Sequence, residues 1–156
     1  MYKTIVAGTD GSDRAAIAIT HAIALAKMHG ANLHVVHAAR PVATGGSGLD
    51  FASVAVAEAN LLHDKGDHIC AQVLAQAERE GVSTEMHNVD GDPANVLLTV
   101  ADAVKADLVV VGNQGMSGIR RFVLGSVPNK VSHHCPCSLL IVSTDTENRD
   151  LGTSRG

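Results

Sequence analysis

Short apolar segments alternate along the chain with longer segments of helical pattern. The apolar segments are rich in Val, Ile and Leu and are bounded by turn residues, which is typical of buried strands. The pattern predicts five strands, at residues 3–8, 32–38, 82–89, 107–112 and 138–142.

Helical patterns fill the segments between these strands. Ser12 and Gly30 are suited to cap the two ends of the first helix. The second helical segment is interrupted only by Gly66, where a long helix could kink, and a turn ending in Pro93 begins the third. The pattern predicts helices at residues 13–30, 51–80, 93–104 and 126–134, and a long loop at residues 40–50.

The alternation of strands and helices predicts an α/β fold with a parallel sheet covered on both faces. We expect one doubly wound, Rossmann-like domain at residues 1–144, with five strands in the order 3-2-1-4-5. The polar tail begins at Thr144 and is expected to fray. Residues 145–156 of this tail lie outside the expected domain. In such a sheet ligands bind where the strand order reverses, which singles out the loops after the first and fourth strands.

Composition narrows the function. The net charge is −4 and the basic residues are scattered, which argues against nucleic-acid and anionic-membrane partners. Tyr2, Phe51 and Phe122 are the only Phe, Tyr or Trp residues, so stacking platforms for flavins or single-stranded nucleic acids are scarce. The start lacks signal-peptide features, and an odd number of cysteines suits a reducing compartment, so we expect a cytoplasmic protein without membrane segments.

The strongest chemical signal is a glycine-rich segment after the fourth strand. Gly112 ends that strand, Gly115 follows, and Gly125-Ser126 opens a helix, with Ser126 expected as its N-cap. Glycines let phosphate oxygens approach backbone N–H groups, and a helix N-terminus adds unpaired donors. The alternative is that these glycines serve only turns and a cap. The segment lacks the Lys of a Walker loop and does not follow the first strand as a Rossmann fingerprint would.

The spacing Gly-x2-Gly-x9-Gly-Ser resembles the nucleotide-binding pattern of the universal stress protein family. Residues 3–6 with 8–12 resemble that family's first strand and acidic loop, Gly91-Asp92-Pro93 its turn before the third helix, and residues 106–112 its fourth strand. The resemblance covers about residues 2–143. It implies an adenine nucleotide ligand: ATP is favoured, AMP and cyclic AMP remain open, and Mg²⁺ could accompany the phosphates.

The resemblance also implies a role for individual residues. Asp10 would lie near the ribose and adenine, Ala38 would meet the adenine through its backbone, and the glycine segment would hold the phosphates. Pro128 stands where relatives often have a donor, so one phosphate contact would be missing. The implied nucleotide-binding residues are Gly8, Thr9, Asp10, Ala38, Val111, Gly112, Gly115, Gly125, Ser126 and Val127.

For three charged residues the residue type itself suggests contact with a ligand, and each also has a simpler explanation. A carboxylate such as Asp10, at the carboxyl end of a strand, can accept two ribose hydroxyl bonds, or it could simply form an Asx-turn before the first helix. Arg120 and Arg121 are candidate phosphate contacts, although adjacent basic pairs are more often solvated.

Metal and catalytic signals are weak in the sequence. The run His133-His134-Cys135-Pro136-Cys137 lacks the second ligand pair of a zinc site and is expected to be a helix C-terminus leading into a strand. The other histidines, at 21, 29, 34, 37, 63, 68 and 87, form no His-Glu-x2-His pattern, and only His37 is near the expected site. We therefore expect no metal ligands, and with no Gly-x-Ser-x-Gly elbow we expect no catalytic residues.

These observations favour a regulatory nucleotide-binding protein in a stress response, with little or no turnover. Nucleotide binding would order the 40–50 loop and the glycine loop and change a surface read by an unidentified protein. The alternatives are a slow ATPase or adenylating enzyme, a flavin-binding electron carrier, and a ligand-free interaction scaffold. The family resemblance implies a homodimer through the last strand, residues 138–142, which is expected at a sheet edge.

Overall fold

The chain folds as strands and helices in strict alternation. The structure is a computed structural model that describes residues 1–39, 49–114 and 123–144. The elements are β1 (Thr4–Thr9), α1 (Asp13–His29), β2 (Asn32–Ala39), α2 (Leu49–Arg79), β3 (Thr84–Asp90), α3 (Pro93–Ala103), β4 (Leu108–Gly112), α4 (Ser126–His134) and β5 (Ser138–Val142). The expected 40–50 loop, apart from its last residues, lies outside the described part of the chain.

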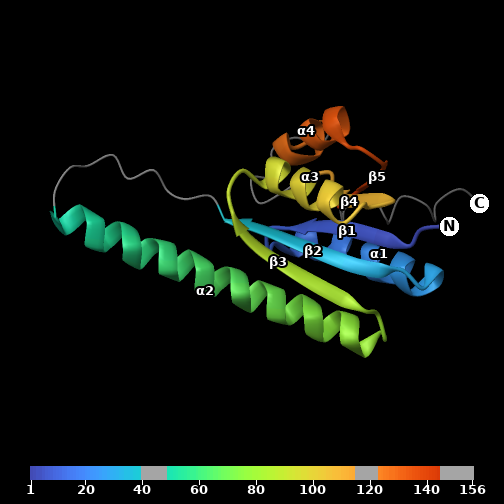
Figure 1. The fold of residues 1–156 in the computed structure, drawn as a ribbon, viewed down its shortest axis with the longest axis horizontal. Helices are drawn as coiled ribbons and strands as arrows, with labels where there is room; N and C mark the ends of the chain where they lie inside the picture. The colour runs from blue at the N-terminus through green and yellow to red at the C-terminus, as the bar shows by residue number, and fades with distance from the viewer. Residues whose placement is uncertain (40–48, 115–122, 145–156) are drawn as a thin grey trace, which may run out of the picture.

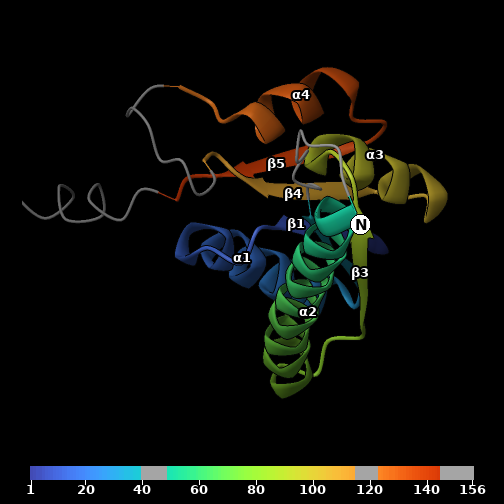
Figure 2. The ribbon, with the colours of Figure 1, turned by 90° about the vertical axis from the view of Figure 1, so that its left-hand side faces the viewer.

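All strand pairs are parallel, and the order in the sheet is β3-β2-β1-β4-β5. This confirms the predicted α/β architecture and strand order. Helices α1 and α2 pack on one face of the sheet and α3 on the other, where it contacts α4 (Figures 1 and 2). The strand order reverses between β1 and β4, so a crevice is expected at their carboxyl ends.

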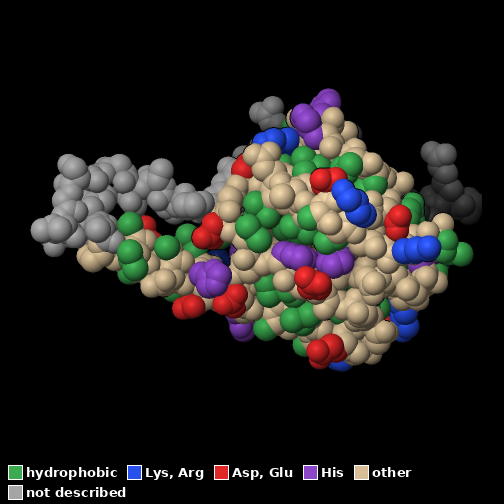
Figure 3. Space-filling view, viewed as in Figure 1, with side chains coloured by type: hydrophobic (Ala, Val, Ile, Leu, Met, Phe, Trp, Pro, Cys, Tyr) green, Lys and Arg blue, Asp and Glu red, His purple; other side chains and the backbone are tan. Residues whose placement is uncertain are grey.

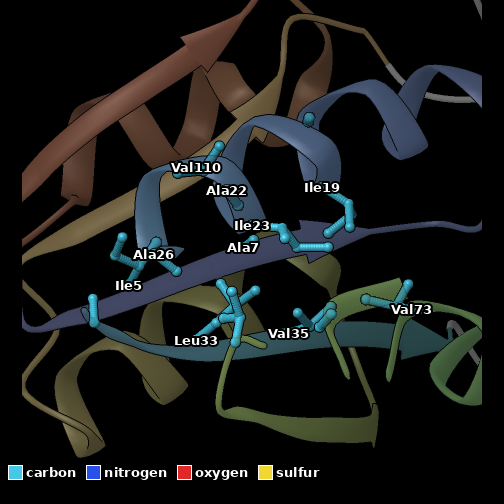
Figure 4. Close-up of a cluster of buried hydrophobic side chains, with 14 of the residues drawn as sticks. Ile5, Ala7, Ile19, Ala22, Ile23, Ala26, Leu33, Val35, Val73 and Val110 are labelled. Atoms are coloured by element: carbon cyan, nitrogen blue, oxygen red, sulfur yellow. The ribbon is translucent and has the colours of Figure 1, made fainter. Parts of the chain in front are cut away.

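The two faces of the sheet carry separate apolar cores, because alternate strand residues point to opposite faces. On the first face, Ile5 and Ala7 of β1 and Leu33 and Val35 of β2 pack against α1 (Figure 4). The buried α1 contribution recurs at helical spacing and consists of Ala18, Ile19, Ala22, Ile23 and Ala26. On the second face, Val6, Val36 and Leu97 belong to the core under α3.

The ends of α1 follow the sequence prediction. The Ser12 hydroxyl accepts a hydrogen bond from the Ala15 amide at 3.1 Å, and Gly30 ends the helix with a φ of 63°. The first helix therefore begins and ends where its capping residues indicated.

The prediction of one long helix across Gly66 is confirmed by α2. The helix continues through this residue, and its first half extends past the sheet (Figure 1). A Cβ at Gly66 would lie 2.5 Å from Asn88 Oδ1, so a larger residue there would displace the Asn88 side chain, which donates to the His63 carbonyl and to Asp67 Oδ1. Packing between elements, which the local pattern does not reveal, explains this glycine.

Thr144 differs from its expectation as the first residue of a frayed tail. The residue is 2% exposed, and its amide and hydroxyl both donate to Asn113 Oδ1, at 2.9 and 2.7 Å. These bonds fix the chain as it leaves β5. Residues 145–156, the rest of the expected tail, lie outside the described part. None of the described helices has the length and apolarity needed to span a bilayer.

Candidate nucleotide site

A cavity of about 400 Å³ opens at the carboxyl ends of β1, β2 and β4, on the face that α3 covers. This volume is within the range of small-molecule sites. Its described lining consists of Gly8, Thr9, Asp10, Ala15, Val36, Ala38, Pro93, Leu97, Val111, Gly112, Gln114, Gly125, Ser126, Val127 and Pro128. The cavity therefore lies where the strand order reverses.

The structure brings nine of the ten predicted nucleotide-binding residues into this lining. Gly115 is the tenth, and it lies outside the described residues together with the candidate phosphate contacts Arg120 and Arg121. Pro128, which the sequence marked as a missing donor, is buried in the lining. The two loops that the sequence singled out thus meet at one cavity.

Three helices begin at this cavity. Ala15 is in the first turn of α1, Pro93 is the first residue of α3, and Ser126 is the first residue of α4. Because a helix N-terminus carries a partial positive charge and unpaired N–H groups, this arrangement favours an anion.

The caps of the three helices differ. Ser12 caps α1 through its side chain, and Asp92 caps α3 by accepting from the Asn95 amide at 3.1 Å. Helix α4 has Gly125 as its N-cap and no side-chain cap. The expectation that Ser126 is the N-cap is therefore wrong: Gly125 has the extended backbone of a cap, and Ser126 is already helical. Gly125, as the N-cap, therefore offers no side-chain acceptor to the first amides of α4.

Asn113 joins the segments that surround the glycine loop. Its carbonyl accepts from the Gly125 amide at 2.9 Å, and its amide donates to the Val142 carbonyl at 2.8 Å. Together with the Thr144 bonds, these contacts hold the end of β4, the start of α4 and the end of β5 at fixed positions. A Cβ at Gly125 would lie 3.3 Å from the Asn113 carbonyl oxygen, which accounts for a glycine at this junction.

Asp10 lines the cavity and also organises the turn into α1. Its Oδ1 accepts from the Ser12 amide at 3.0 Å and from the Ser12 hydroxyl at 2.6 Å. The Asx-turn alternative is therefore confirmed as a structural role, and it coexists with a position on the cavity wall.

The sequence reasoning missed a polar pair beside the cavity. Arg14 Nη1 donates to Gln114 Oε1 at 2.6 Å, and Gln114 is a buried lining residue. Arg14 is the second residue of α1 and Gln114 the second after β4, so their proximity follows from the pairing of β1 with β4. The apolar wall residues Val36 and Leu97 were also missed. Val36 has the same strand parity as the predicted Ala38, a signal that could have identified it.

His37 is not part of this site. It faces the opposite side of the sheet from Val36 and Ala38, is 7% exposed, and its Nδ1 lies 3.0 Å from Asn88 Oδ1. The alternative that its side chain simply belongs to the sheet describes it correctly.

The histidine- and cysteine-rich run also has the expected structure. Helix α4 ends at His134, and Cys135 Sγ lies 3.9 Å from Cys137 Sγ. Burial, with the neighbouring Cys135, raises the pKa of Cys137 to about 12, which keeps this thiol protonated at neutral pH. Within the described ranges, the residues that could jointly hold a metal are others: His34, Glu85 and His87. Burial lowers the pKa of His34, outweighing the opposite effect of Glu85.

Comparison with known proteins identifies the family of this chain. A family model described as Universal stress protein family matches residues 1–143. Universal stress protein MJ0531 of Methanocaldococcus jannaschii is 34% identical over 142 residues, which are 91% of this chain and 82% of that protein.

Solved structures give the same result. A universal stress protein in complex with cAMP is 34% identical, with a TM-score of 0.68 over 92% of this chain and 98% of its own. The structure of hypothetical protein MJ0577, 21% identical, has a TM-score of 0.83 over 94% of this chain and 99% of its own, which shows the same fold. The chain therefore belongs to the universal stress protein family.

Proposed function

We propose that the cavity binds an adenine nucleotide and that the protein acts as a nucleotide-dependent regulatory module in a stress response, with little or no turnover. The observation that carries this proposal is the start of α4, which opens onto the cavity and has no side-chain cap. A phosphate oxygen would take the place of the missing acceptor.

The chemistry of the lining matches the parts of a nucleotide. Gly125, Ser126 and Val127 would bind the phosphates, while Val36, Ala38 and Leu97 form an apolar wall for the base. Gly8 contributes to the same wall, since a Cβ there would lie 3.5 Å from Leu97. Asp10 would accept ribose hydroxyl bonds in addition to those from Ser12, because a carboxylate accepts several hydrogen bonds at once.

Positive charge for the phosphates would come from Arg14, held beside the cavity by Gln114, and from Arg120 and Arg121 of the glycine loop. The relative solved with cAMP supports the adenine nucleotide class. Within that class we propose ATP, with Mg²⁺ on its phosphates, ahead of AMP and cyclic AMP, because a glycine-rich segment that leads into a helix N-terminus is typical of sites that bind several phosphates.

Low turnover is supported by the charged groups of the cavity. Of the described lining residues, Asp10 alone carries a carboxylate, and its Oδ1 already holds the turn at Ser12. Hydrolysis needs a positioned water and stabilisation of the charge that develops on the transferred phosphoryl group. A single carboxylate that already holds a turn is poorly suited both to position the water and to stabilise this charge, which supports low turnover.

Calorimetric titration of ATP, AMP and cyclic AMP tests the proposal, with the substitution Ser126→Pro as the probe of the α4 terminus. Proline is well tolerated at the first helical position, and the extended backbone of Gly125 suits a residue before proline. The change removes the Ser126 amide hydrogen, so the loss of one charge-assisted bond should weaken binding by about ten- to a hundredfold.

Asp13→Pro is the matched control, because it removes the amide hydrogen at the same position of α1, which Ser12 caps. We expect its nucleotide affinity to stay within about twofold of the original. The proposal fails if no nucleotide binds at about 1 mM, or if the two proline variants bind equally well. Mass spectrometry of ligand retained through native purification would identify the nucleotide.

A homodimer through β5 is a second proposal. This strand is at one end of the sheet, and its Leu139, Leu140 and Ile141 are only partly buried. An exposed strand edge is a site for pairing with another chain. Light scattering should give twice the chain mass of 16.1 kDa and a mass that falls on dilution. A mass of one chain at every concentration would refute the dimer.

A further inference from the structure

A cluster of histidines lies on the sheet outside the nucleotide cavity. His34 of β2 is in register with Glu85 of β3, and His87 follows Glu85 by two residues, so all three side chains share the face of Val36. Figure 3 shows histidine side chains together at the surface below α3, with acidic groups next to them. The cluster is close to the cavity along β2 but takes no part in its lining.

The three side chains converge on one point. His34 Nδ1 lies 3.1 Å from His87 Nε2. Glu85 Oε2 lies 3.8 Å from His34 Nδ1, and Glu85 Oε1 lies 3.8 Å from His87 Nε2. The histidine side chains are 14% and 20% exposed and that of Glu85 is 67% exposed. Two largely buried imidazoles thus lie on the sheet, with an exposed carboxylate beside them.

These separations match those of ligand atoms around a tetrahedral metal ion. Zinc bonds of about 2.0–2.1 Å to nitrogen and oxygen place neighbouring ligand atoms roughly 3.3 Å apart. The separation of the two nitrogens, and that of each nitrogen from the nearer oxygen of Glu85, lie within about half an ångström of this value, so a rotation of the carboxylate would bring one oxygen to a ligand position. A carboxylate that is two-thirds exposed can move by that amount.

We propose that His34, Glu85 and His87 bind a divalent transition-metal ion, of which Zn²⁺ is the best fit. Imidazole nitrogens favour Zn²⁺, Co²⁺, Ni²⁺ and Cu²⁺ over Mg²⁺ and Ca²⁺, so this site is chemically distinct from a Mg²⁺ site on nucleotide phosphates. Two histidines and one glutamate leave one position of a tetrahedral ion open to water or another ligand, as in zinc sites that are not purely structural.

A simpler explanation of the cluster is a cross-strand histidine pair that shares one proton. The same 3.1 Å contact would then be a hydrogen bond between the imidazoles, whose rings are 5.4 Å apart and inclined by 31°. That explanation predicts no stoichiometric metal binding, so the two can be separated by experiment.

The experiment is a titration of the full chain, freed of metal and nucleotide, with ZnCl₂ in a buffer without phosphate. We expect one Zn²⁺ bound per chain. The variants His34→Gln, Glu85→Gln and His87→Gln should each lower the affinity for Zn²⁺. The histidine variants should lower it by at least about a hundredfold, because changes even to residues that only support the ligands lower metal affinity ten- to a hundredfold. His68→Gln, an exposed histidine of α2 outside the cluster, is the control and should bind as the original chain does.

Cys135 and Cys137 with the adjacent histidines are the competing site, since thiolates also bind Zn²⁺. The double variant Cys135→Ser/Cys137→Ser should keep the ion. The Co²⁺-loaded protein should show the visible bands of a tetrahedral ion without an intense thiolate charge-transfer band. Proton NMR keeps the test independent of the variants: the imidazole signals of His34 and His87 should shift on Zn²⁺ addition.

The proposal is overturned by substoichiometric binding, by variants of the three residues that bind as tightly as the control, or by loss of the ion in the cysteine variant. Failure of nucleotide binding would leave it intact, because none of its ligands lines the nucleotide cavity.

Discussion

The Thr144 amide and hydroxyl both donate to Oδ1 of Asn113, just beyond the paired ends of β4 and β5. The Asn113 backbone holds the N-cap of α4 at the same time. Asn113 therefore connects the chain after the last strand, through its side chain, to the helix terminus at the nucleotide cavity, through its backbone.

Asn113→Ala should lower the free energy of unfolding by about 1–3 kcal/mol, because the buried Thr144 hydroxyl would lose its partner. Urea denaturation measures the change. Thr144→Val is the comparison: it removes the hydroxyl but keeps the amide bond, so its loss should be smaller. Equal stability of Asn113→Ala and the original chain would show that this connection contributes nothing.

Gly66→Ala tests the close approach of α2 to β3. Alanine at an interior helix position is normally more stable than glycine by about 1 kcal/mol. Here the Cβ would lie 2.5 Å from Asn88 Oδ1, and Asn88 also binds Asp67 Oδ1 at 2.8 Å. We expect the overlap with Asn88 to outweigh the better helix propensity of alanine, so that the free energy of unfolding falls by about 1–3 kcal/mol.

The Gly66 prediction has an internal control in a double-mutant cycle. In an Asn88→Ala background the obstacle is gone, so Gly66→Ala should become neutral or stabilising. The same loss in both backgrounds would mean that the glycine serves a different purpose.

Features of the fold and site that depend on residues close in the sequence could be predicted, while those that depend on distant residues could not. The bounds of α4 and β5 and the caps of α1 follow from local signals, and the structure has them as predicted. The nine described residues of the predicted site meet at one cavity because a parallel sheet brings its carboxyl ends together. The error at Ser126 is one residue, within the usual uncertainty of helix ends.

What the sequence did not reveal depends on pairing between distant segments. The contact of Arg14 with Gln114 spans 100 residues, and that of His34 with His87 spans 53. Neither pair has a spacing motif, because strand register rather than sequence distance brings them together. The expectation of no metal ligands considered only contiguous runs and helical spacings, so it could not include this cluster.

The carboxyl group of Asp107 should make the free energy of unfolding depend on pH in the acid range. Its Oδ2 accepts from the amides of Lys3 and Thr4 at 2.7 and 2.9 Å, and these bonds lower the pKa of the carboxyl group. A lowered folded-state pKa stabilises the fold above pH 3.8, the usual value, and the contribution disappears as the pH falls through the folded-state pKa.

The variant Asp107→Asn should therefore have a lower urea midpoint than the original chain at pH 7, and the difference should shrink at about pH 3. Asp102→Asn, which breaks only an exposed ion pair with Lys105, should change the midpoint little. A difference for Asp107→Asn that is the same at both pH values would contradict the assigned cause.

Cys137 should be a slow nucleophile. With its pKa raised from 9.0 to about 12, its thiolate fraction at pH 8 is roughly a thousandfold lower than in the unfolded chain. Greater basicity makes each thiolate roughly twenty- to thirtyfold more reactive, so alkylation should be about thirtyfold slower overall. Iodoacetamide labelling, followed by peptide mass spectrometry of native and urea-unfolded protein, measures this ratio. Equal rates would show that the thiol is not held protonated.

Successive side chains of β3 lie on opposite faces of the sheet, and this limits which insertions the turn before β3 can accept. Asn88 supports α2 from one face, while its neighbour His87 belongs to the metal-binding cluster on the other. A slip of β3 by one residue relative to β2 would exchange these faces, bringing an amide to the cluster and an imidazole beneath α2. Insertions in the turn at Gly81 should therefore be tolerated only if they leave the pairing of His34 with Glu85 unchanged, so the length of that turn is under a functional as well as a structural constraint.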